Sequence, residues 1–130
     1  MLCLMPQLWG DLLLNVLLMT LHRPLSQKLA ALNDQARQSM TGCTLFLTKG
    51  IFELPELVQD AILAKVRDFG AFTPDNDPYG EHDFGAFDFA GERIYWKFDY
   101  YDPNMQFGSS DPTDPAQTTR VLTVLLADEW

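Results

Sequence analysis

The sequence predicts an α+β fold: a single small domain with a short antiparallel sheet, a C-terminal β-hairpin and about three packed helices. Three observations favour it. Residues 83–100 alternate between apolar and polar side chains around a glycine turn, residues 25–39 and 55–68 carry apolar side chains at helical spacing, and 47% hydrophobic content in 130 residues suits one core.

The first predicted helix covers Leu25 to Ser39, with Ser26 as its cap. Its apolar stripe has the three- and four-residue spacing of a helix face and consists of Leu25, Leu29, Leu32 and Ala36. Gly42 ends this region, and Thr41 to Thr48 then favours a strand because it contains the run TLFLT. Lys49 and Gly50 are typical of a turn.

Pro55 opens a second predicted helix that runs to about Asp68. Proline is tolerated in a first helical turn, and Glu56 suits the positive end of the helix dipole. Gly70 ends the helix. The predicted core-facing stripe comprises Val58, Ile62, Val66 and Phe69.

A β-hairpin is predicted for Asp83 to Phe89 and Glu92 to Tyr100, with a two-residue turn at Ala90 and Gly91. Its register places Gly85 opposite Trp96, so the glycine leaves room for the indole. The expected core face comprises Phe87, Ile94, Trp96 and Phe98.

The other face of this hairpin carries polar pairs. The register sets Asp88 against Arg93, Phe84 against Lys97 and, at the open end of the hairpin, His82 against Asp99. After a loop rich in Asp, Pro, Gly and Ser, Asp114 is expected to cap a final helix with Pro115 at its first position. Its apolar stripe would comprise Val121, Leu122, Leu125 and Leu126.

Residues 1–24 differ in composition from the rest of the chain, being rich in Leu and Met. No Lys or Arg precedes Arg23, so a signal peptide is not expected. Polar residues and a proline interrupt the run, so a membrane span is not expected either. We predict a dispensable hydrophobic extension followed by one domain over residues 25–130. Cys3 and Cys43 are expected to be reduced thiols, with Cys43 packed as a small hydrophobe.

Negative charge is concentrated late in the chain. The net charge is −9, and ten acidic residues between Asp75 and Asp114 face only Arg93 and Lys97. Direct nucleic-acid binding is therefore not expected, because it needs clustered basic residues. A basic protein surface is a better partner. The alternative is an ordinary well-solvated acidic surface.

The acidic loop before the hairpin supplies several candidate binding residues. Its oxygen-bearing side chains could surround a divalent cation, although the spacing is not that of an EF-hand. The alternative is a turn network in which short carboxylates accept bonds from backbone amides. The candidates in this loop are Asp75, Asp77, Tyr79, Glu81 and Asp83.

His82 and Asp99 are the candidate catalytic pair. A histidine held by a carboxylate can act as a general base or a metal ligand, and Lys97, Glu81 and Asp102 would support it. The alternative is a structural ion pair that holds the strand ends. Tyr101, just past the strand, is expected to be exposed and available as a binding contact.

Three long segments resemble a bacterial family known as domain of unknown function 3768. They are NDPYGEHDFGAF (residues 76–87), GERIYWKFDYYD (residues 91–102) and the final DP-x-D-P with RVLTVLLADEW (residues 111–130). LNDQARQSMTG (residues 32–42) is similar to the family's opening helix, so the resemblance covers about residues 25–130. It implies a cytoplasmic accessory protein, often encoded by a mobile element, and it assigns no catalytic residue.

Two functions remain open. The first is a protein-binding module that binds a basic surface through its carboxylates, with a charge pattern that imitates nucleic acid. The second is a small metal-dependent enzyme or metal-binding protein with a site at His82 and Asp99. The two differ in geometry, because mimicry needs carboxylates spread over an exposed face whereas a site needs them to converge. No cofactor is expected apart from a divalent cation under the second hypothesis, and the oligomeric state is left open.

Overall fold

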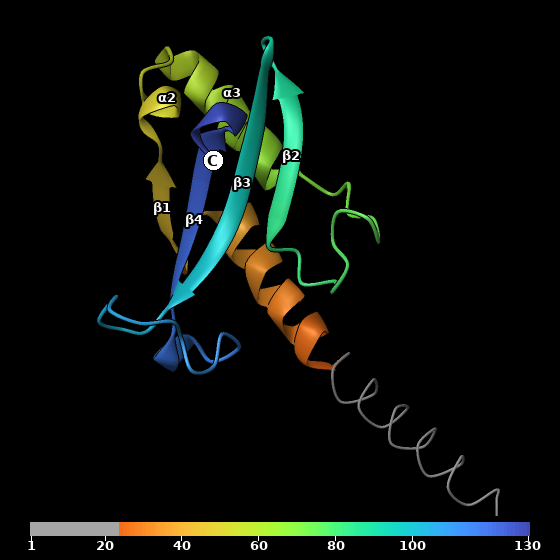
Figure 1. Cartoon of the computed structure of the whole chain (residues 1–130), viewed down its shortest axis with the longest axis vertical. Coiled ribbons are helices and arrows are strands. Elements are labelled where there is room, and N and C mark those ends of the chain that lie inside the picture. The colour runs from red at the N-terminus through yellow and green to blue at the C-terminus, as the bar shows by residue number, and fades with distance from the viewer. Residues whose placement is uncertain (1–23) are drawn as a thin grey trace, which may run out of the picture.

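A four-stranded sheet forms the centre of the computed structural model, which describes residues 24–130 (Figure 1). The strand order is β1-β4-β3-β2, with bounds β1 Thr44–Leu47, β2 Phe84–Phe89, β3 Glu92–Tyr101 and β4 Thr119–Leu126. β1 runs parallel to β4, and the other neighbours are antiparallel. The predicted α+β class is confirmed. The sheet is mixed rather than antiparallel, and the hairpin precedes the last strand.

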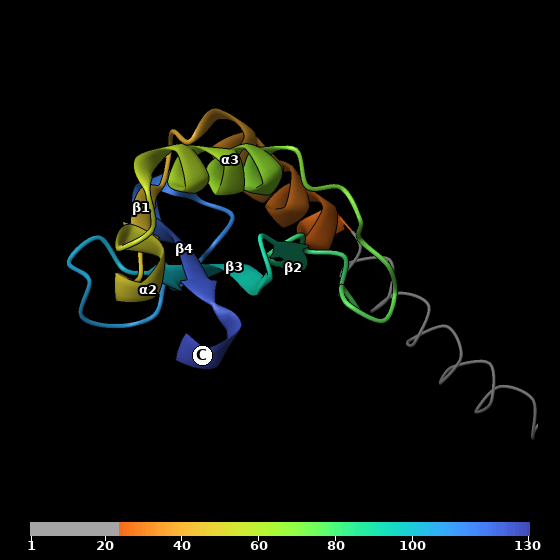
Figure 2. The ribbon, with the colours of Figure 1, turned by 90° about the horizontal axis from the view of Figure 1, so that it is seen from above.

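The longer helices cover one face of this sheet only. Figures 1 and 2 show the helix over residues 24–39 and α3 (Glu56–Arg67) on the same side, while the chain's C-terminus lies on the other side. Short elements complete the described chain: α2 (Lys49–Phe52) and two 3₁₀ turns, η1 (Pro115–Gln117) and η2 (Ala127–Glu129). Among the described residues, no helix has both the length and the apolar character needed to cross a bilayer.

The helix over residues 24–39 is rotated relative to the sequence prediction. Leu25 is 58% exposed, and Ser26, predicted as the cap, lies inside the helix and is buried. The buried side chains still recur every three or four residues, but they include two polar ones. They are Ser26, Leu29, Ala30, Asn33, Ala36 and Arg37.

The middle of the chain follows most of the predicted pattern. β1 lies within the predicted strand, but Lys49 and Gly50 begin the short helix α2 instead of forming a turn. α3 begins directly after Pro55, and Ile62 and Val66 are fully buried on its inner face. Val58 and Phe69 pack against the same core, which confirms the predicted stripe.

The hairpin has the predicted turn and register. Ala90 and Gly91 have φ of 52° and 80°, the left-handed values that a two-residue turn of this kind requires. Gly85 pairs with Trp96, and a Cβ at Gly85 would collide with the indole. Ile94, Trp96 and Phe98 are buried on the helix-covered face, as expected.

The predicted C-terminal helix is wrong, because residues 119–126 form the central strand β4. Asp114 does cap a helical segment, accepting a bond from the Ala116 amide, but that segment is only the three-residue η1. Val121, Thr123 and Val124 are β-branched and favour a strand. A strand with neighbours on both edges and burial on both faces also has a continuous apolar sequence, which is easily read as a helix.

Some sequence predictions fall outside the described residues. The predicted dispensable extension, residues 1–24, lies outside the described residues except for Pro24, and Cys3 lies outside them too. Cys43 is a free thiol that packs against the core, and burial raises its pKa. This agrees with the predicted role as a small hydrophobe.

Candidate functional site

His82 occupies a strained position at the entrance to β2. Its φ is 54°, in the left-handed region that side chains with a Cβ rarely adopt. One carboxylate oxygen of Asp77 accepts bonds from the backbone amides of Glu81 (3.1 Å) and His82 (3.3 Å), and the Asp77 side chain is only 6% exposed. These bonds offset the strain and fix the direction in which the imidazole leaves the backbone.

The imidazole lies between two carboxylates. Its Nδ1 is 2.9 Å from an oxygen of Asp34, and its Nε2 is 3.6 Å from Asp77. The ring also stacks on Phe72, with 3.9 Å between centroids and 1° between planes. Arg37, 1% exposed, completes the cluster through a 2.9 Å ion pair with Asp34. We call Asp34, Arg37, Asp77 and His82 the His82 cluster.

The expected pairing of His82 with Asp99 is wrong. Asp99 points to the open face of the sheet, where it forms a 2.7 Å ion pair with Lys97, whereas the stacking of His82 on Phe72 places it on the covered side. The reason is the left-handed backbone at His82, which breaks the strand alternation on which the prediction relied.

The His82 cluster does not form a shared ligand position. Its two carboxylates face opposite ring nitrogens, so a substrate or metal at either nitrogen would have to displace one of them. Across residues 24–130, no group of three or more His, Cys, Asp or Glu side chains is arranged to hold a metal ion.

A second polar network joins the same helix to the sheet. Fully buried Asn33 donates to the hydroxyl of Tyr100 (2.7 Å) and the carbonyl of Glu81 (3.0 Å), and accepts from Nε of Arg120 (2.9 Å). Arg120 also donates to the carbonyl of Pro112. Burial lowers the pKa of Arg120 and raises that of Tyr100, which remains a neutral hydroxyl.

Sequence reasoning missed four members of these networks: Asn33, Asp34, Arg37 and Arg120. One signal was present, because Asn33 and Arg37 are four residues apart and therefore share a face of the helix. Two large polar residues on a face that also carries Leu29 and Ala36 indicate buried polar partners. Nothing in the sequence indicates that Arg120 is one of them.

The open face of the sheet carries an aromatic cluster. Phe84 from β2, Tyr95 from β3 and the C-terminal Trp130 meet with ring centroids 5.4–5.8 Å apart. Lys97 lies 5.4 Å above the Trp130 ring. Phe46 of β1, 57% exposed, pairs with Thr123 in the same sheet and therefore points to the same side. We call Phe46, Phe84, Tyr95, Lys97 and Trp130 the open-face cluster.

Trp130 is anchored although its side chain is 68% exposed. The preceding residue, Glu129, accepts bonds from the Thr48 hydroxyl (2.7 Å) and the amides of Gly50 (2.9 Å) and Leu126 (3.0 Å). These bonds, led by the one from Thr48, hold the pKa of Glu129 below its usual value. They also fix the last turn, η2, against α2 and its N-cap residue Thr48, so the indole is positioned before any partner arrives.

The acidic loop before β2 is a network of turns, in agreement with the alternative to a cation site. Asn76 accepts from the amide of Thr73, as Asp77 does from the amides after it. Asp75 and Tyr79 are exposed, Tyr79 at 68%, and Glu81 and Asp83 are half-buried. Burial raises the pKa of Asp83, with smaller contributions from Asp77 and Asp99.

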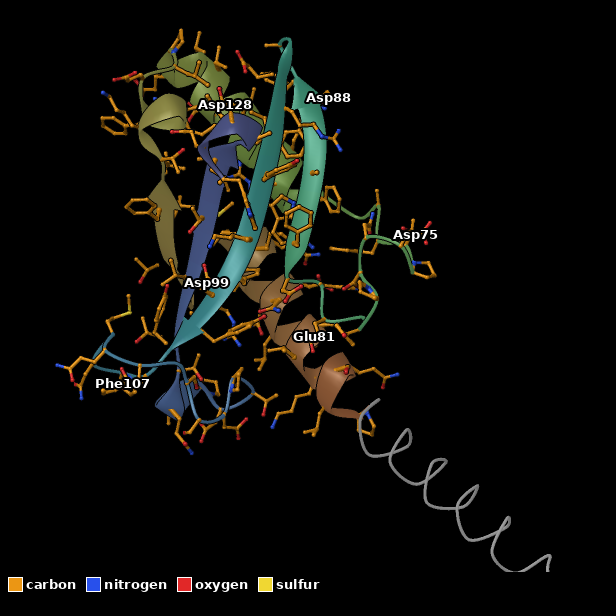
Figure 3. All side chains as sticks on the ribbon, viewed as in Figure 1. Asp75, Glu81, Asp88, Asp99, Phe107 and Asp128 are labelled. Carbon is orange, nitrogen blue, oxygen red and sulfur yellow. The ribbon has the colours of Figure 1, made fainter. Side chains whose placement is uncertain are left out.

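The remaining candidates lie at the far end of β3. Tyr101 is half-buried rather than exposed and bridges to Gly108, while Asp102 caps its own loop by accepting from the amide of Gln106. The acidic side chains labelled in Figure 3 lie at separate places on the molecule and do not converge. They are Asp75, Glu81, Asp88, Asp99 and Asp128.

Comparison with known proteins identifies a family but no activity. Residues 47–129 match the model of the family described as "Protein of unknown function (DUF3768)". No curated protein and no solved structure matches the chain.

Proposed function

Because the chain belongs to the DUF3768 family, whose description states no activity, we propose a function from its own structure: a cytoplasmic accessory module that binds a basic protein. The single observation that carries the proposal is the open-face cluster. Its aromatic side chains lie on the sheet face opposite the helix of residues 24–39 and α3, and Glu129 holds Trp130 in place. Anchored, half-exposed aromatic residues are the side chains that dominate protein–protein binding energies.

The charge of the protein supports a basic partner. The net charge is −9, and two carboxylates lie on the open side of the sheet, exposed Asp88 on β2 and Asp99 on β3. Carboxylates around an apolar centre increase the rate at which a basic protein meets that centre, and they contribute little to the free energy of binding. The separation of the labelled acidic residues in Figure 3 suits a binding surface better than a single pocket.

The proposal is tested by removing the anchored aromatic side chain. The full chain is immobilised, proteins that it retains are purified, and each is titrated by calorimetry against wild type and Trp130→Ala. We expect affinity to fall by about tenfold or more with Trp130→Ala and to fall with rising salt. The matched control is Phe107→Ala, which removes a 72% exposed aromatic ring from a loop beyond the end of the sheet (Figure 3).

Equal losses with both variants, or no loss with either, would contradict binding at the open face. A competing outcome concerns His82 and Asp99. If Mg²⁺, Ca²⁺, Mn²⁺ or Zn²⁺ raised the melting temperature in a concentration-dependent way, and His82→Ala abolished that rise, a metal site would be the better account.

A further inference from the structure

Among the described residues, β2 is an edge strand whose one neighbour in the sheet is β3, so one row of its backbone groups faces outward. The amide of Phe98 donates to the carbonyl of Asp83 (2.9 Å), so Gly85 and Phe87, at two-residue steps along β2, also exchange backbone hydrogen bonds with β3. The backbone N–H and C=O groups of the alternate residues point away from β3. These alternate residues, whose backbone groups face outward, are Phe84, Ala86 and Asp88. None of the turn, loop or cap hydrogen bonds within residues 24–130 uses their backbone groups.

A hollow of about 470 Å³ lies beside this edge. It separates the C-terminal end of α3 from β2, so a segment placed there would contact both elements. Gly70 borders the hollow, and a Cβ built on it would meet nothing within 4 Å. The lining is mostly apolar and comprises Ala64, Lys65, Asp68, Phe69, Gly70, Ala71, Ala86 and Phe87.

We propose that the free edge of β2 binds an extended, basic segment of a partner protein as a fifth strand, with an apolar side chain of that segment in the hollow. The inference rests on the proposed function and names the way in which the partner is held. The edge is continuous with the open-face cluster, because Phe84 belongs to both. One partner can therefore reach across the two surfaces.

The chemistry of the edge selects the occupant. Outward N–H and C=O groups recur at every second residue, a spacing that only another extended backbone satisfies throughout. Residues 65–88, which form and border the edge, carry acidic side chains at Asp68, Asp75, Asp77, Glu81, Asp83 and Asp88, against Lys65 and Arg67. The C-terminal end of α3 adds the negative end of a helix dipole. A segment that alternates basic and apolar residues fits both features.

The test uses the full chain and a defined probe, a fluorescein-labelled octapeptide of sequence KVKVKVKV with blocked ends. Fluorescence anisotropy measures its dissociation constant. Gly70→Leu fills the hollow and should weaken binding about tenfold or more, whereas Gly108→Leu, the same change at an exposed glycine of a distant loop, should leave it unchanged. Ala86→Pro removes an outward N–H and no bond to β3, and should also weaken binding.

Backbone methylation of the peptide separates strand addition from simple charge attraction. Two peptides are made, one N-methylated at every Lys and one at every Val. An added strand has one edge against β2 and one in solvent, so one methylated peptide should lose binding and the other should keep it. This comparison does not depend on any protein variant folding. The peptide EVEVEVEV should not bind.

The proposal is overturned if both methylated peptides bind like the parent, if EVEVEVEV binds equally well, or if Gly70→Leu and Gly108→Leu behave alike. A concentration-dependent dimer that Gly70→Leu abolishes would assign the edge to a second copy and also overturn it. These outcomes distinguish failure of the β2 proposal from failure of the proposed function. If Trp130→Ala weakens partner binding and the β2 variants do not, the proposed function stands and the β2 proposal fails. If only the β2 variants weaken partner binding, the proposed function at the open face is refuted.

Discussion

The two faces of β3 carry alternate residues of one ten-residue strand, yet their surroundings differ sharply. On the covered face, Ile94 and Trp96 are completely buried and Phe98 is 5% exposed, under the helix of residues 24–39 and α3. On the open face, Tyr95 and Lys97 are half-buried and contact the returning C-terminus through Trp130. Stability therefore depends mainly on the covered face, which leaves the open face available for contacts with another protein.

Polar residues follow the same division. On the covered side, Arg37, Asn33 and Arg120 have fixed partners at hydrogen-bonding distance, and their loss would leave buried donors or acceptors unpaired. On the open side, the pairs Lys97–Asp99 and Asp88–Arg93 are partly or fully exposed, and such pairs contribute little.

The largest effect is expected at the contact between Gly85 and Trp96. Gly85→Val places a branched side chain where the indole lies, and should lower the free energy of unfolding by about 3 kcal/mol. Ala86→Val, one residue later and directed to the open side, should change it by less than about 0.5 kcal/mol. Urea unfolding followed by circular dichroism measures both. Similar losses in the two variants would remove the contrast between the faces.

The next effect concerns the buried amide of Asn33. Asn33→Leu removes two donors and the acceptor used by Nε of Arg120, and should cost about 2 kcal/mol because a buried cationic group loses a partner. Gln35→Leu makes the same kind of change at an exposed position of the same helix and should be nearly neutral. If the two variants melt alike, the network contributes specificity and not stability.

The covered face was the more predictable of the two. Alternation around the turn at Ala90 and Gly91 predicts the pairing of Gly85 with Trp96. A shift of the register by one residue would move the apolar side chains of one strand to the opposite face of the sheet, so burial of one face fixes the register. α3 was predictable for the same reason, from its period of 3.6 and its flanking proline and glycine. β4 was not, because an apolar run buried on both faces has no period to distinguish strand from helix.

The candidate site was less predictable because its contacts are nonlocal. The bond between Arg120 and Asn33 joins residues 87 apart in the sequence, and no spacing rule reaches that far. His82 was identified as a candidate, but its partner was not, since a single left-handed residue redirects the side chain. The open-face cluster was missed because Trp130 reaches the sheet only after β4 has been placed in its centre.

A smaller effect tests the anchor of the open face. Glu129→Gln exchanges one acceptor oxygen for an amide that faces the Gly50 N–H, and should cost about 1 kcal/mol at neutral pH after allowance for solvent screening. The folded-state pKa of Glu129 is lowered, so the ionised carboxylate stabilises the folded protein at pH values above the unfolded-state pKa. This stabilisation fades as the pH falls through the folded-state pKa. Asp128→Asn, the neighbouring exposed carboxylate, is the control. Thermal melts at a series of pH values from 7 downward should show a Glu129→Gln deficit that is largest at pH 7 and shrinks as the solution becomes more acidic.

The smallest effect has the opposite sign and arises at Asp83, where β2 begins. Partial burial raises the pKa of this carboxyl, and Asp77 and Asp99 add to the shift, so the folded state holds its proton more tightly than the unfolded chain does. When the folded-state pKa of an acid is raised, the ionised carboxylate destabilises the folded protein at pH values above that pKa. This destabilisation disappears below the ordinary pKa of 3.8. Asp83→Asn should therefore stabilise the protein at pH 7, by less than about 1 kcal/mol because the group is partly exposed. The gain should fade as the pH falls below that ordinary value, where the Asp83 carboxyl is protonated in both the folded and the unfolded protein. Melting temperatures of Asp83→Asn and Glu129→Gln measured across this range should move in opposite directions relative to wild type. A destabilised Asp83→Asn at pH 7 would mean that the Asp83 carboxylate has a binding partner strong enough to outweigh its burial.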